Sequence, residues 1–156
     1  MDFDQAVGIV IRVEGGFVDD LDDPGGMTKY GISARAFPEV DIASLTEDGA
    51  RALYLDHYWI PGKCALLPER LRLIYFDMCV LHGLHAAAIT LQRALNGAGY
   101  PIAVDGIIGS ETIRAAAYLE PERLRSYRIL RIASIVAKRP SMGKYWFGWY
   151  RRAIEV

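Results

Sequence analysis

The 156-residue chain is poor in the residue types that build metal sites and disulfide frameworks. It has three histidines and two cysteines, and the cysteines, Cys64 and Cys79, lack the nearby histidine pairs of a zinc site. His82 and His85 lie three residues apart without a carboxylate at helical spacing, so we interpret them as ordinary histidines. We therefore expect no metal ion and no cofactor, and two buried free thiols rather than a disulfide.

The chain also lacks an apolar run of the 18 or so residues that a membrane span needs. The most apolar stretch, residues 71–95, is interrupted by charged and polar side chains. The first residues, Met1-Asp2-Phe3-Asp4, have neither the basic start nor the cleavage site of a signal peptide. We expect a protein without stable membrane insertion that is made in the cytoplasm. To act in the periplasm or cell wall, it would need release by a holin or an export system.

Net charge is small, −1, but acidic and basic residues are separated along the chain. Residues 1–60 contain twelve acids and four bases, whereas residues 121–156 contain nine bases and two acids. A basic end can attract an anionic polymer such as nucleic acid, cell wall or lipid headgroups, or it can be a solvated helix face that balances the acidic half. No nucleotide-binding fingerprint is present, and no other feature supports a nucleic-acid partner.

Hydrophobic periodicity predicts helices over most of the chain. The first spans residues 3–13 and ends at Gly15-Gly16, because glycine supplies a left-handed cap. Glycine, proline and paired acids between residues 15 and 32 predict a small β-hairpin or irregular β-lobe. Further helices are expected at residues 33–38, 46–58, 68–83, 84–96, 110–119, 121–138 and 145–150. The predicted fold class is α+β and predominantly helical, with a cleft between the lobe and the helical body.

Glu14 lies four residues after Val10, on the inward stripe of the first helix. Glycosidic bond cleavage needs one protonated carboxylic acid and a second polar group that stabilises a developing cation or activates water. Desolvation raises the pKa of a carboxyl group, which suits a general acid at Glu14. An aspartate of the polar lobe would stay ionised, and Thr28 could hold a water molecule.

Each of these residues also has a simpler interpretation. Glu14 could turn to solvent at the helix end. The aspartates at positions 19, 20, 22 and 23 could form a solvated turn or a calcium loop, although the spacing and closing glutamate of an EF-hand are missing. Thr28 could be an ordinary strand residue. Spacing alone leaves these alternatives open.

Two segments of this region carry a resemblance to a known family. They are Glu14-Gly15-Gly16-Phe17 and Asp22-Asp23-Pro24-Gly25-Gly26-Met27-Thr28-Lys29-Tyr30-Gly31-Ile32. The pattern resembles the signature of glycoside hydrolase family 108, the N-acetylmuramidases of phages and prophages, which include bacterial proteins labelled secretion activators. The resemblance implies a lysozyme-like fold and Glu14 as the catalytic acid. By analogy with the Glu-Asp-Thr triad of phage-type lysozymes, whose second gap is commonly one residue longer, Asp23 and Thr28 take the other two roles.

Later segments extend the resemblance over most of the chain. Residues 76–83 resemble a family segment in which Leu81 replaces the usual asparagine, and residues 147–152 resemble its closing Gly-Trp-x-x-Arg. Residues 91–95 and 104–112 are similar to the associated peptidoglycan-binding region. The implied organisation is a catalytic region at 1–83 and a helical peptidoglycan-binding-like region at 84–156, packed into one unit.

The resulting hypothesis is an enzyme that hydrolyses the β-1,4 bond between N-acetylmuramic acid and N-acetylglucosamine in peptidoglycan glycan strands. The candidate substrate-binding residues are Tyr30, Tyr58, Trp59 and Gln92. Aromatic residues at a helix end more often belong to the core, and a polar residue such as Gln92 on a helix more often faces solvent. The alternatives are a lytic transglycosylase and a non-catalytic wall-binding or secretion accessory protein.

Overall fold

The computed structural model describes residues 1–14 and 26–156. The fold is α+β and predominantly helical, with one two-stranded sheet near the N-terminus among the described residues, which confirms the predicted class. In chain order the elements are α1 (Phe3–Glu14), β1 (Thr28–Lys29), β2 (Ile32–Ser33), α2 (Glu47–Tyr54), the π-helical η1 (Leu55–Trp59), the 3-10 helix η2 (Cys64–Leu66), α3 (Glu69–His82), α4 (Leu84–Gly97), α5 (Ser110–Ala116), α6 (Pro121–Lys138), the 3-10 helix η3 (Pro140–Tyr145) and α7 (Trp146–Glu155).

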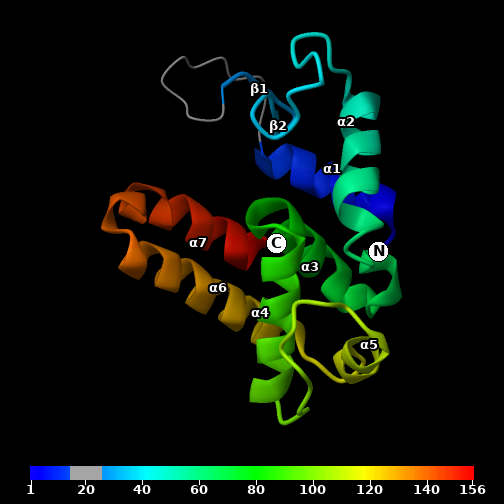
Figure 1. The fold of residues 1–156 in the computed structure, drawn as a ribbon, viewed down its shortest axis with the longest axis vertical. Helices are drawn as coiled ribbons and strands as arrows, with labels where there is room; N and C mark the ends of the chain where they lie inside the picture. The colour runs from blue at the N-terminus through cyan, green and yellow to red at the C-terminus, as the bar shows by residue number, and fades with distance from the viewer. Residues whose placement is uncertain (15–25) are drawn as a thin grey trace.

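Helix α3 lies at the centre of the molecule and packs against α1, α4 and α6 (Figure 1). Its apolar side chains Leu71, Ile74, Tyr75, Phe76 and Met78 are almost completely buried. Helices α6 and α7 lie side by side, and α7 returns the C-terminus to the middle of the molecule (Figure 1). The end of the chain therefore lies close to its first half, and this arrangement shapes the candidate site.

Helix α1 buries the stripe that its sequence predicts: Ala6, Val7, Val10 and Ile11 are inward. At its start, Phe3 makes edge-to-face contacts with Trp59 and Phe76. The helix ends at Glu14. Apolar packing along one side thus fixes the position at which α1 delivers its last side chain.

The β-hairpin pairs Thr28 with Ser33 and Lys29 with Ile32 in antiparallel register. Its two turn residues, Tyr30 and Gly31, have positive φ angles of 52° and 78°. Two consecutive left-handed residues match the twist of a tight hairpin. The hairpin forms the described part of the β-lobe that was predicted between residues 15 and 32. Residues 15–25 lie outside the described residues.

Two helix predictions differ from the structure in the kind of element, and two others differ at their ends: α5 ends at Ala116 instead of residue 119, and α7 continues to Glu155 instead of residue 150. After Ser33 the chain forms only a single turn, closed by the Phe37 amide donating to the Ser33 carbonyl at 3.0 Å, in place of a helix over 33–38. The following Pro38 has no amide hydrogen with which to continue it. Helix α2 begins as predicted at the cap Thr46, which accepts from the Gly49 amide at 3.1 Å, but it ends as the π-helix η1.

Cys64 and Cys79 are buried free thiols, as expected. A Cβ atom at Gly62 would lie 3.1 Å from one sulfur and 3.2 Å from the other, so the two thiols are neighbours. A hydrogen bond to Cys79, together with burial, raises the pKa of Cys64. None of the helices in the described ranges has the length and apolar character that crossing a membrane requires.

Candidate active site

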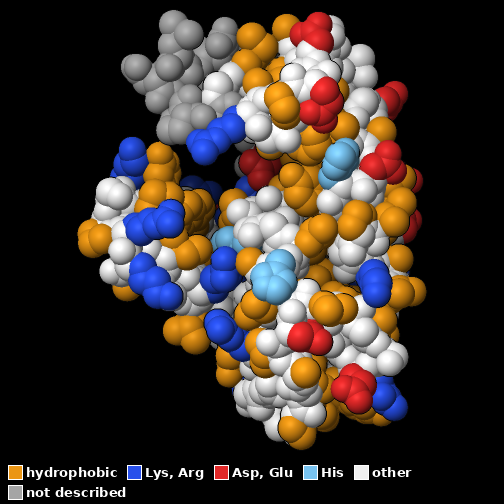
Figure 2. Space-filling view, in the orientation of Figure 1, with side chains coloured by type: hydrophobic (Ala, Val, Ile, Leu, Met, Phe, Trp, Pro, Cys, Tyr) orange, Lys and Arg blue, Asp and Glu red, His pale blue; other side chains and the backbone are white. Residues whose placement is uncertain are grey.

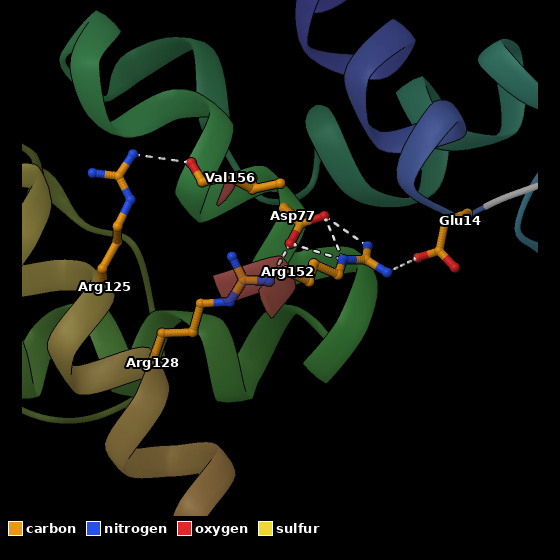
Figure 3. Close-up of polar contacts among 6 residues, drawn as sticks. All are labelled: Glu14, Asp77, Arg125, Arg128, Arg152 and Val156. Carbon is orange, nitrogen blue, oxygen red and sulfur yellow. Dashed lines mark hydrogen bonds and ion pairs between the residues drawn. The ribbon is translucent and has the colours of Figure 1, made fainter. Parts of the chain in front are cut away.

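Glu14 occupies the last position of α1, and its side chain is only 21% exposed. Its Oε1 atom forms an ion pair with Nη1 of Arg152 in α7 at 2.5 Å (Figure 3). The carboxyl group is therefore held from one side by a residue 138 positions further along the chain. The sequence predicts apolar surroundings for Glu14, but in the structure they include the Arg152 cation.

Arg152 is held in turn by Asp77, a fully buried residue of α3 (Figure 3). The Arg152 guanidinium donates from Nη2 to Oδ1 at 2.6 Å and from Nε to both carboxylate oxygens at 3.1 and 3.2 Å. Asp77 also accepts from the buried Arg128 of α6. Burial acts to lower the pKa of Arg152, but the hydrogen bonds and charges of Asp77 and Glu14 outweigh it and raise the pKa.

We call Glu14, Arg152, Asp77 and Arg128 the ion chain. It joins four helices, α1, α7, α3 and α6, through alternating charges. A planar guanidinium bound by two carboxylates has little rotational freedom, because its donors have fixed directions. Glu14 is therefore oriented by a network that extends through the core.

On the opposite side, the turn of the β-hairpin contacts Glu14. A Cβ atom at Gly31 would lie 2.6 Å from Glu14 Cγ and 2.4 Å from Tyr54 Oη, so only glycine fits there. Tyr54, in α2, is buried and donates its hydroxyl to the Tyr30 carbonyl at 3.0 Å. Burial raises the pKa of Tyr54, and the nearby Glu14 carboxylate adds to the rise.

Glu14 lines a groove of about 410 Å³ between α1, α3 and α7. Phe147 and Trp149 of α7 line it as well, and Phe147 is 68% exposed. Figure 2 shows the surface hollowed on the side of α7 that faces the hairpin. Leu81, which stands where the resembled family has asparagine, also lines this groove. An oriented carboxyl group beside exposed aromatic surface is suited to a saccharide.

The predicted catalytic partners of Glu14 are only partly described. Asp23 lies outside the described residues. Thr28 is half-buried in β1, and its hydroxyl donates to the Gly26 carbonyl at 3.3 Å. It belongs to the hairpin whose turn contacts Glu14. Its role in catalysis stays a prediction.

The predicted substrate-binding residues are spread over different parts of the fold. Tyr58 is half-buried close to Glu14: burial raises its pKa, and the Glu14 charge adds to the effect. Tyr30 is half-buried in the hairpin turn, with Lys29 Nζ 5.6 Å from its ring centroid. Trp59 is 6% exposed and belongs to the core, against Phe3.

Gln92 lies in α4, is 1% exposed and is engaged by the protein itself. Its amide nitrogen donates to Asp105 Oδ1 at 2.7 Å and to the Ile107 carbonyl at 3.0 Å, and its oxygen accepts from the Gly106 amide at 2.8 Å. In this structure it holds the turn before α5 and does not face the groove.

Sequence reasoning assigned no role to Arg152 or Asp77. Both carry a detectable signal: Asp77 is an acid within an apolar helix, and Arg152 closes an aromatic tail. A charge in such a position needs a buried partner. Nothing in the sequence, however, pairs two residues that are 75 positions apart.

The segment that carries Glu14 belongs to a glycosyl hydrolase domain, as comparison with known families shows. Residues 7–83 match the family model for Glycosyl hydrolase 108, and residues 86–154 match the Predicted Peptidoglycan domain. The chain therefore carries a family 108 glycosyl hydrolase domain followed by a peptidoglycan-binding domain, as the resemblance implies.

A solved structure, described as the "Structure of Brucella abortus SagA", is similar over nearly the whole chain. The TM-score is 0.80 with 25% sequence identity, over 98% of this chain and 90% of that one. Together with the family 108 match, this similarity confirms the lysozyme-like fold. No curated protein sequence gives a significant match.

Proposed function

We propose that this glycosyl hydrolase is an N-acetylmuramidase that cleaves the β-1,4 bond between N-acetylmuramic acid and N-acetylglucosamine in peptidoglycan. The observation that carries the proposal is the oriented Glu14 carboxyl group at the wall of a 410 Å³ groove, inside the segment that matches family 108. The peptidoglycan domain that follows supports the substrate class. To act on the wall, the protein would have to leave the cytoplasm through a holin or an export system.

In the proposed reaction, Glu14 protonates the leaving glycosidic oxygen. Asp23 and Thr28, from the segment that precedes and forms the hairpin, stabilise the developing cation or position the attacking water. Arg152 and Asp77 direct the Glu14 carboxyl group toward the groove. The aromatic side chains of Phe147 and Trp149 offer apolar faces to the sugar rings.

The first test is release of soluble muropeptides from purified Gram-negative sacculi. We expect Glu14→Gln to release them at least about 10²–10⁴-fold more slowly than wild type, because glutamine cannot supply the proton. Glu155→Gln is the matched control, since Glu155 lines the same groove and pairs only with Arg151 at 3.1 Å among the described residues. Equal rates for wild type and Glu14→Gln would show that Glu14 is not the acid.

Mass spectrometry of the released fragments distinguishes hydrolysis from lytic transglycosylation. Hydrolysis adds water across the glycosidic bond and leaves reducing ends, whereas a transglycosylase forms 1,6-anhydro ends that lack this water. We expect reducing ends, because Asp23 and Thr28 provide polar groups for a water molecule. Anhydro ends as the main product would contradict the muramidase assignment while keeping the peptidoglycan substrate.

A further inference from the structure

A second groove, of about 420 Å³, lies between α4 and α6, away from Glu14. Arg93, Arg131 and Lys138 line it, and none of the described residues along its wall is acidic. Figure 2 shows the wider pattern: Lys and Arg side chains gather over α6, α7 and the adjoining part of α4. We call Arg93, Arg131 and Lys138 the cation cluster.

The positive charge of the cation cluster is not neutralised within residues 1–14 and 26–156. None of its three members forms an ion pair with a described acid. The Nε atom of Arg131 is buried and has no hydrogen-bond partner in this part of the chain. Burial lowers the pKa of Arg131, and the nearby charge of Arg93 lowers it further.

Like charges held together repel one another, and an unsatisfied buried donor costs free energy. An anion that enters this groove would relieve the repulsion between the cations, because guanidinium and ammonium groups form strong hydrogen bonds with carboxylate and phosphate oxygens. The groove therefore has the electrostatics of an anion-binding site.

We propose that the cation cluster binds the carboxylate groups of peptidoglycan stem peptides. The inference rests on the proposed function and adds a second contact with the same polymer. The whole groove lies within residues 86–154, the segment that matches the peptidoglycan domain. A stem peptide carries several carboxylates on a short chain with methyl groups, and the groove combines the cations with Ser134 and the exposed Leu130. Its volume suits a short peptide better than a membrane surface or a long polymer of phosphates.

The test measures binding of a synthetic stem tripeptide, L-alanyl-γ-D-glutamyl-diaminopimelic acid, to the full-length Glu14→Gln protein by isothermal titration calorimetry. Arg93→Gln and Lys138→Gln, each added to this background, should weaken binding about tenfold, because each removes a charged contact. Arg139→Gln is the matched control: Arg139 is exposed beside Lys138 and does not line the groove. Binding constants are compared only among variants whose melting temperature equals that of the Glu14→Gln protein.

Amidated tripeptide and other anions test whether the carboxylates of the tripeptide are the groups that the cation cluster binds. The tripeptide with its carboxylates converted to amides should bind at least about tenfold more weakly than the free acid. Equal binding of both forms, or an equal loss in Arg139→Gln, would overturn the proposal. It would also be overturned if phosphatidylglycerol vesicles or inorganic phosphate bound in a cluster-dependent way and the tripeptide did not.

Hydrolysis of sacculi by the wild-type protein is measured in parallel. Muropeptide release without tripeptide binding would reject the cation cluster as a stem-peptide site and leave the muramidase intact. Tripeptide binding without any release would reject the muramidase and leave a wall-binding site.

Discussion

At the residue scale, Gly31 determines how closely the hairpin approaches Glu14. We expect Gly31→Ala to reduce muropeptide release at least tenfold, because the new methyl group would have to displace Glu14 Cγ or Tyr54 Oη. Gly26→Ala is the control: Gly26 also has a positive φ, 67°, but a Cβ there meets no atom of the described residues within 4 Å. Both variants carry backbone strain of about 1 kcal/mol, so only the close approach differs. Equal activity of the two would mean that Gly31 does not hold Glu14 in place.

Asp77 is the residue on which two buried arginines depend. We expect Asp77→Asn to lower the free energy of unfolding by about 3–5 kcal/mol, because Arg128 and Arg152 would both lose their buried counter-charge. Denaturant unfolding measures the change. Glu155→Gln, which breaks an exposed pair with Arg151, should change stability by less than about 1 kcal/mol. A loss in Asp77→Asn as small as in this control would show that the ion chain contributes little to folding.

At the element scale, α4 fixes the turn before α5 through Gln92. We expect Gln92→Leu to destabilise the protein by about 2–3 kcal/mol, because the Gly106 amide and the Ile107 carbonyl lose their buried partner. Hydrogen exchange should accelerate most at residues 105–109. Arg93→Leu, at the adjacent exposed position of the same helix, is the control. A uniform acceleration over the whole chain would contradict a local role for Gln92.

The helices were predictable because each has a periodic apolar stripe or a clear boundary residue. Thr46 caps α2 and Pro121 opens α6 as expected. The π-helix η1 was not predictable, since apolar periodicity does not distinguish an α-turn from the i to i−5 bond that Ile60 makes to Leu55. The segment after Ser33 was also mispredicted, because a favourable cap does not reveal that only one turn follows.

The place of Glu14 in the candidate site was predictable from the sequence, but the residues that orient it, Arg152 and Asp77, were not. The position of Glu14 follows from local periodicity and from a motif within one segment. Arg152 and Asp77 depend on packing between α7 and α3, which brings together residues that are remote in sequence. The surroundings of Gln92 were also not predictable: its polar side chain on a helix suggested substrate binding, which stays a prediction, and the structure adds that it is buried with internal hydrogen-bond partners.

At the scale of the whole molecule, the two family matches do not correspond to two separate functional parts. Glu14 and Asp77 lie in the segment that matches the hydrolase, and Arg152 lies in the segment that matches the peptidoglycan domain. The division into residues 1–83 and 84–156 stays a prediction. The ion chain crosses it, so the second segment helps to build the candidate active site as well as carrying a groove of its own.

The burial of His82 in the helical body makes the stability of the whole protein depend on pH. Burial lowers the pKa of His82 from 6.5 to about 4, and the charges of Arg128 and Arg131 add to this effect. The unfolded chain therefore binds a proton at this residue between pH 6.5 and 4, where the folded protein does not. The neutral His82 side chain should therefore contribute about 3 kcal/mol to the free energy of unfolding above pH 6.5. This contribution should be lost as the pH falls toward 4.

Denaturant unfolding at pH 7 and pH 4.5 measures this contribution in wild type and His82→Gln. We expect wild type to lose about 2–3 kcal/mol more than the variant over this interval, because glutamine does not titrate. The exposed His57, replaced in the same way, controls for the loss of a histidine at the surface. If His82→Gln loses as much stability as wild type on acidification, then His82 is not the residue that opposes folding at low pH.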